Sequence, residues 1–136
     1  MNTKRISSKW IGSLEANEIF VFGSNLAGQH GGGAARVAYA KFGAVWGQGV
    51  GLHGRTYAIP TMQGGIETIA PYVDDFLNFA KSHPKLKFLV TEIGCGIAGF
   101  TTKEVAPLFR RAIDDNIENV YLPESFWGWI EFYNNI

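Results

Sequence analysis

Residues 18–42 read EIFVFGSNLAGQHGGGAARVAYAKF, and this stretch decides the fold class. Its first part, 18–22, is a short run of apolar, β-branched and aromatic residues, which is typical of a buried strand. A polar loop follows, and the triple glycine at 31–33 opens an alanine-rich segment that we expect to be helical to about residue 42. The stretch therefore predicts a strand that leads through a glycine-rich loop directly into a helix.

The rest of the chain repeats the alternation of strand and helix. The pattern of apolar residues predicts strands at 56–60, 88–93 and 120–122, an edge strand within 6–11, and helices at 67–82, 101–116 and 124–134. This order predicts one α/β domain over 1–136, a three-layer α/β/α arrangement with a mostly parallel or mixed sheet. In such sheets ligands bind at the carboxyl ends of the strands, where the loops 23–33 and 94–100 would lie.

Local signals refine these elements. Pro71 suits the first turn of its helix, where a missing N–H costs least. Thr101 and Glu104 match the capping-box pattern, whereas Pro107 falls inside the same predicted helix and is expected to kink it. The segment 44–55 is a glycine-rich loop, which the sequence allows to be either a flap over the site or a simple connection.

Composition excludes several classes of protein. The 136 residues carry 12 basic and 12 acidic side chains, so zero net charge gives no signal for a nucleic-acid partner. Hydrophobic residues make up 46% of the chain, which argues against disorder, and the single cysteine excludes an intramolecular disulfide. No apolar stretch has the length of a signal peptide or a membrane span. We expect a cytoplasmic protein with no membrane partner, no bound metal and no cofactor.

Glycine is in excess, with 17 residues, and fifteen of them lie in four short stretches. Two segments match G-x-G-x-x-G. The one at 49–54 precedes a strand and is read as a chance match, but the one at 94–99 follows a strand and precedes a helix, as a dinucleotide fingerprint does. A Rossmann-type NAD-binding domain is therefore one alternative, although only one predicted strand follows the motif.

The loop that ends in the triple glycine favours an anion. Backbone N–H groups without side-chain cover at a helix N-terminus attract phosphate. Close packing of helix on sheet would also require glycine, so one such loop does not decide between the two. Two glycine-rich loops between strand and helix in one small sheet favour a ligand with two or more phosphates.

These two loops together resemble the macrodomain family, whose members bind ADP-ribose. Gly23-Ser24-Asn25 and the glycine triplet at 31–33 match the family's first loop, and Gly94-Cys95-Gly96-Ile97-Ala98-Gly99-Phe100 matches its second. The I-G-C-G wording at 93–96 and the K-F-G at 41–43 are similar to the branch of terminal ADP-ribose and DNA-ADP-ribosyl glycohydrolases. The resemblance covers about 18–122.

The resemblance implies a set of ligand-binding residues. Asn25 and Phe100 would lie near the distal ribose, and the backbone of both loops would line the diphosphate. The full set is Ser24, Asn25, Gly31, Gly32, Gly33, Ala34, Gly94, Cys95, Gly96, Ile97, Ala98, Gly99 and Phe100.

Several positions depart from the family's pattern. The acidic residues that two hydrolase branches use correspond to Ala35 and Ala98, and the first asparagine of the first loop is Phe22. No aspartate in 1–17 matches the one that holds adenine in the family. The known hydrolytic groups are therefore missing.

The remaining catalytic candidates are Asn25, His30 and Glu92. His30 either contacts the ligand or faces solvent, and Glu92 is either a base with a raised pKa or, as we favour, a partner for a loop N–H. Cys95 is a reactive thiolate or, as we favour, a small packing residue. Arg55 would pair with a phosphate if the loop 44–55 folded over the site.

The leading hypothesis is a module that binds ADP-ribose, a related nucleotide or an ADP-ribosylated macromolecule. The alternatives are a hydrolase of an ADP-ribosyl derivative, a Rossmann-type NAD-binding protein, and an interaction protein in which the glycines serve packing alone. The aromatic stretch 124–134 is interpreted as core or as a face for a homo-oligomer.

Overall fold

The structure, a computed structural model, describes residues 4–135, which form a mixed sheet with the strand order β1-β6-β5-β2-β4-β3. The strands are β1 (Ile6–Ser7), β2 (Glu18–Ser24), β3 (Gly51–His53), β4 (Thr56–Pro60), β5 (Lys87–Val90) and β6 (Val120–Pro123). All neighbours are parallel except β3, which runs antiparallel to β4 at one edge. The predicted α/β fold with a mostly parallel or mixed sheet is confirmed.

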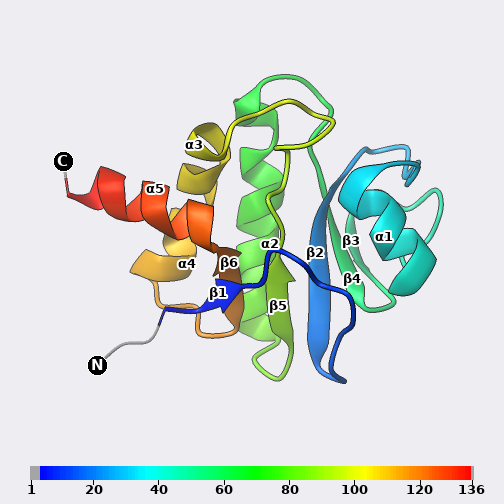
Figure 1. The fold of residues 1–136 in the computed structure, drawn as a ribbon, viewed down its shortest axis with the longest axis horizontal. Helices are drawn as coiled ribbons and strands as arrows, with labels where there is room; N and C mark the ends of the chain where they lie inside the picture. The colour runs from blue at the N-terminus through cyan, green and yellow to red at the C-terminus, as the bar shows by residue number, and fades with distance from the viewer. Residues whose placement is uncertain (1–3, 136) are drawn as a thin grey trace.

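Helices cover both faces of this sheet. They are α1 (Gly33–Lys41), α2 (Ala70–Ser82), α3 (Thr102–Val105), α4 (Arg110–Asp114) and α5 (Glu124–Asn134), with short 3₁₀ helices at Ile66–Thr68 and Ala106–Phe109. Figure 1 shows α1 beside β2, β3 and β4, and α3, α4 and α5 at the other end of the molecule. No helix within residues 4–135 is long and apolar enough to cross a membrane.

Strand β2 is buried on both faces, which explains its continuous apolar run. Ile19 and Val21 point into the larger core, which they share with α2, α5 and the segment from α3 to α4. Phe20 and Phe22 point to the opposite face, where they pack against the alanines of α1. Short alanine side chains allow this helix to lie close to the sheet.

The N-terminal segment after β1 crosses in front of the sheet before the chain enters β2 (Figure 1). Its start is anchored, because Ser7 pairs with Pro123 in β6 and the Ser7 hydroxyl donates to the Val90 carbonyl at 2.6 Å. At its end, the Arg55 guanidinium donates to the carbonyls of Leu14 and Glu15. The segment is therefore tied to the sheet at both ends.

Several boundaries differ from the predictions. The predicted edge strand within 6–11 has only two residues, and β5 ends at Val90 rather than at 93. The cause in β5 is Thr91, whose N–H and hydroxyl both donate to the Val21 carbonyl as the chain turns away. The predicted loop 44–55 contains β3, which a tight turn at Gly54 joins to β4.

The predicted helix 101–116 is interrupted. Its start is as expected, since Thr101 and Glu104 form a reciprocal capping box. Pro107 lies within the 3₁₀ turn that separates α3 from α4, because proline lacks the N–H that a continuous helix would need there. Pro71 lies in the first turn of α2, as predicted.

Candidate functional site

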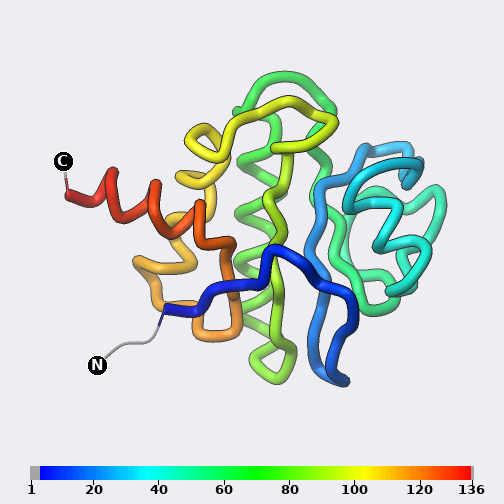
Figure 2. Tube along the Cα trace, in the orientation of Figure 1, coloured from blue at the N-terminus to red at the C-terminus, as the bar shows by residue number. Residues whose placement is uncertain are grey.

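A cavity of about 330 Å³ opens where β2, β4 and β5 end, and both glycine-rich loops line it. Figure 2 shows the loop 94–100, in yellow, and the loop 24–32, in blue to cyan, at the same edge of the molecule. The sheet register explains the meeting point, since Val21 is paired with Val90 and Ser24 with Pro60 in parallel strands. The segments that follow these three neighbouring strands therefore lie close together at one edge of the sheet.

Most of the residues expected to bind ligand line this cavity. They are Ser24, Asn25, Gly32, Gly33, Ala34, Gly94, Cys95, Gly96, Ile97 and Ala98. Gly31, Gly99 and Phe100 do not line it, and the ring of Phe100 packs against the larger core instead. Of the catalytic candidates, Asn25 and Glu92 are at the cavity and His30 is not.

Other lining residues lie outside the predicted ligand-binding set. They are Gly23, Gln29, Ala35, Thr61, Met62, Thr91 and Ile93. A signal existed for Thr61 and Thr91, because each directly follows a parallel strand and so occupies the same edge of the sheet as the loops. Gln29 and Met62 carry no comparable signal.

The second loop presents unused backbone donors. The N–H groups of Gly96, Ile97 and Ala98 have no hydrogen-bond acceptor within residues 4–135. The loop is nevertheless fixed, because the Phe100 N–H donates to the Gly94 carbonyl at 2.9 Å and Gly94 adopts a left-handed φ of +76° that favours glycine. Three successive N–H groups without acceptors in a fixed loop can donate hydrogen bonds to an anion.

The start of α1 supplies a second set of donors. Its N-cap is Gly32, which has no side chain to accept a hydrogen bond from the first turn, and no acidic residue lies in that turn. The N–H groups of Gly33, Ala34 and Ala35 therefore have no partner inside the helix, and all three residues line the cavity. The positive end of the helix dipole also favours a negative ligand here.

Glu92 and Cys95 are the only titratable side chains that line the cavity within the described residues, and neither is basic. Burial, and to a smaller extent the nearby carboxylates of Glu92 and Glu104, together raise the pKa of the Cys95 thiol to about 11. The raised pKa, half burial and contact with the Ile93 carbonyl favour the packing interpretation over a reactive thiolate. The Glu92 carboxylate accepts from the Ser125 hydroxyl at 2.6 Å rather than from a loop N–H.

The first loop is held by its own polar side chains. Asn25 binds the backbone of Gln29 with both amide atoms, accepting from the N–H at 2.9 Å and donating to the carbonyl at 3.0 Å. His30 is only 1% exposed, so the expectation that it faces solvent or ligand is wrong. Its Nε2–H donates to the carbonyls of Val45 and Gln48. These hydrogen bonds hold the loop 44–55 against the first loop.

The glycine-rich loop 44–55 supports the first loop from behind and does not cover the cavity. The Ser24 hydroxyl donates to the Gly49 carbonyl, and the Gly47 N–H donates to the Gly28 carbonyl at 2.9 Å. A Cβ atom at Gly49 would lie 2.0 Å from the Asn25 carbonyl oxygen, so only glycine fits there. Arg55 binds the N-terminal segment and is not available to a phosphate.

Within residues 4–135 no three His, Cys, Asp or Glu side chains are grouped closely enough to hold a metal ion. Comparison of the chain with protein-family models, with curated proteins and with solved structures finds no match.

Proposed function

We propose that the protein binds ADP-ribose or a related nucleotide, with the diphosphate held between the loop 94–100 and the start of α1. The observation that carries the proposal is one cavity lined by two sets of unpaired backbone N–H groups. Phosphate oxygens accept several N–H donors at once, and two separate sets suit two linked phosphates. The resemblance of both loops to those of macrodomains supports the same ligand.

The composition of the cavity also favours a nucleotide with a ribose over a bare polyanion. No lysine, arginine or histidine side chain among the described residues lines it, so a highly charged ligand gains no ion pair. Asn25, Gln29, Thr61 and Thr91 line the same cavity, and their side chains are of a kind that suits the hydroxyl groups of a sugar. The threonine hydroxyls donate to backbone carbonyls and keep lone pairs that can accept.

Isothermal titration calorimetry with ADP-ribose, ADP, NAD and inorganic sulfate tests the proposal. We expect ADP-ribose to bind and sulfate at equal concentration to show no heat of binding. Tighter binding of NAD than of ADP-ribose would support the Rossmann-type alternative instead. Absence of binding to all three nucleotides would contradict the proposal and leave the glycines a packing role.

A second function, hydrolysis of an ADP-ribosyl derivative, is favoured by one observation. The Glu92 carboxylate is exposed at the cavity, where it could accept a proton from a water molecule. Turnover of ADP-ribosylated peptide or of ADP-ribose 1″-phosphate would show this activity. Glu92→Gln should then abolish turnover and keep ADP-ribose binding, whereas Ser125→Ala, which removes only the hydrogen-bond partner of Glu92, should retain most of it.

A further inference from the structure

Trp10 is the most exposed large hydrophobic side chain described, with 83% of its surface accessible. A tryptophan normally buries most of its area, so such exposure calls for a physical reason. Its backbone is fixed, because the Ser8 hydroxyl accepts from the Trp10 N–H and donates to the Trp10 carbonyl. The backbone that carries the indole is therefore restrained by hydrogen bonds. Lys9 Nζ lies 5.9 Å from the centroid of the indole ring.

The segment that carries Trp10 starts beside the cavity. The Ser7 hydroxyl donates to the carbonyl of Val90, the last residue of β5. The two residues that follow Val90, Thr91 and Glu92, line the cavity. Ser7 is also paired with Pro123, two residues before the Ser125 hydroxyl that binds Glu92. Three residues of extended chain span at most about 10 Å, so the Cα atom of Trp10 lies within about 10 Å of the Cα atom of Ser7.

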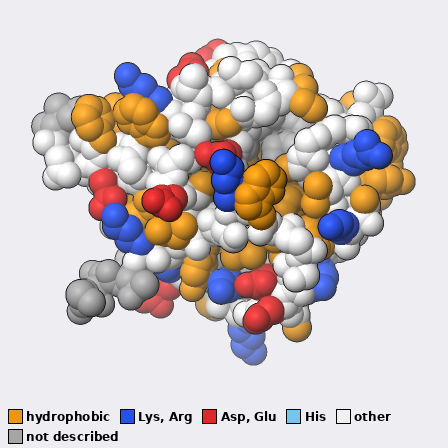
Figure 3. All heavy atoms as spheres, in the orientation of Figure 1, with side chains coloured by type: hydrophobic (Ala, Val, Ile, Leu, Met, Phe, Trp, Pro, Cys, Tyr) orange, Lys and Arg blue, Asp and Glu red, His pale blue; other side chains and the backbone are white. Residues whose placement is uncertain are grey.

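Figure 3 shows hydrophobic and basic atoms gathered where the N-terminal segment crosses the face, beside a hollow in the surface. The cavity itself is lined by no Phe, Tyr, Trp or His side chain among the described residues, so it offers no aromatic surface for a planar base. An aromatic platform would have to come from its border.

We propose that Trp10 is a stacking platform for the base of the bound nucleotide. This inference rests on the proposed function, since it places the base beside the cavity that holds the diphosphate. Base–aromatic stacking tolerates any planar base, because every base has a π face. The ammonium of Lys9, 5.9 Å from the centroid of the Trp10 ring, adds positive charge beside this platform.

The test compares Trp10→Ala, Trp10→Phe and, as a matched exposed aromatic, Phe132→Ala near the end of α5, with wild type. Phe132 is 53% exposed and does not line the cavity. We expect Trp10→Ala to weaken ADP-ribose binding at least about fivefold, and Trp10→Phe to retain most of the affinity. ADP-ribose should quench tryptophan fluorescence in wild type, and this quenching should disappear in Trp10→Phe.

Ribose 5-diphosphate, which lacks a base, separates stacking from a general effect of the substitution. An equal loss of affinity for this ligand and for ADP-ribose in Trp10→Ala would overturn the stacking proposal. Wild-type affinity of Trp10→Ala for ADP-ribose would also overturn it while leaving the proposed function standing. If wild type binds no ADP-ribose, the proposed function fails and the stacking proposal fails with it.

Discussion

The side chain of Ile97 reaches across the cavity from the second loop to Gly32 at the start of α1. A Cβ atom added at Gly32 would lie 2.8 Å from Ile97 Cδ1. Ile97 is 73% exposed, so this contact with the opposite loop is not made in a packed core. The absence of a side chain at Gly32 therefore leaves room for the end of Ile97, an exposed side chain, between the two sets of N–H donors.

Gly32→Leu should weaken ADP-ribose binding by more than about tenfold, because the new side chain would occupy this space. The fold should be kept, since Gly32 has a φ of −150°, an extended conformation that any residue adopts. Calorimetry measures the loss and thermal unfolding checks the fold. Gly31→Leu is the matched control, because a Cβ atom there meets nothing within 4 Å and Gly31 does not line the cavity. Unchanged affinity of Gly32→Leu would place the ligand elsewhere.

The position of the cavity could be predicted from sequence because it follows from topology. Parallel strands end at the same edge, so the loops after β2 and β5 had to meet once both strands were recognised as buried. The same rule covers Thr61 and Thr91. Gln29 could not be predicted, because its place depends on the clamp that the Asn25 side chain forms within the loop.

The role of the loop 44–55 could not be predicted, for a different reason. Its contacts with the first loop are made by backbone groups and by the side chains of Ser24 and His30, and none of these leaves a periodic pattern in the sequence. The short strand β3 within it depends on pairing with β4, which is a tertiary interaction. The break between α3 and α4, in contrast, is signalled by Pro107.

His30→Phe should lower the free energy of unfolding by about 1–3 kcal/mol, because the carbonyls of Val45 and Gln48 would lose a buried donor. Denaturant unfolding at pH 7.5 measures the change. His83→Phe serves as the control, because His83 is exposed and water can replace its hydrogen bonds. Equal stability of His30→Phe and wild type would show that His30 does not hold the loop 44–55.

Cys95 should react with iodoacetamide on the order of a hundredfold more slowly than a free cysteine at pH 7.5, because only the thiolate reacts. Burial and the nearby carboxylates raise its pKa to about 11, so the thiolate fraction and the rate should still be rising above pH 10. Mass spectrometry of the alkylated protein gives the rate, with N-acetylcysteine as the reference thiol. A rate that levels off below pH 8.5 would contradict this. Cys95→Ser should bind ADP-ribose as wild type does.

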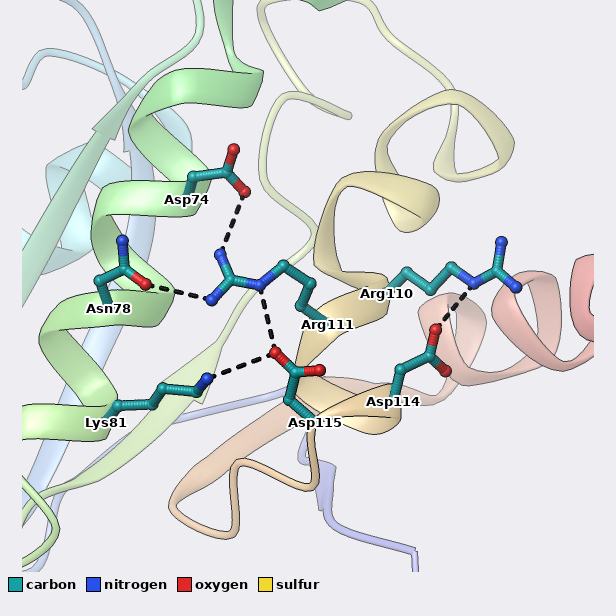
Figure 4. Close-up of polar contacts among 7 residues, drawn as sticks. All are labelled: Asp74, Asn78, Lys81, Arg110, Arg111, Asp114 and Asp115. Carbon is teal, nitrogen blue, oxygen red and sulfur yellow. Dashed lines mark hydrogen bonds and ion pairs between the residues drawn. The ribbon is translucent and has the colours of Figure 1, made fainter.

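Asp115 should make the protein more sensitive to acid. Its carboxylate accepts from Lys81 on α2 and Arg111 on α4, both at 3.3 Å, and Arg111 also reaches Asp74 and Asn78 of α2 (Figure 4). These hydrogen bonds, that from Lys81 first, hold the pKa of Asp115 below its ordinary value of 3.8. A lowered pKa stabilises the fold above the unfolded-state pKa, and the contribution is lost as pH falls through the folded-state value.

Asp115→Asn should therefore lose less stability than wild type between about pH 5 and pH 2, as measured by urea unfolding. Asp114→Asn is the matched control, because Asp114 pairs with Arg110 on its own helix and does not join α2 to α4. A wild-type acid dependence in Asp115→Asn would show that this bridge contributes nothing to folding.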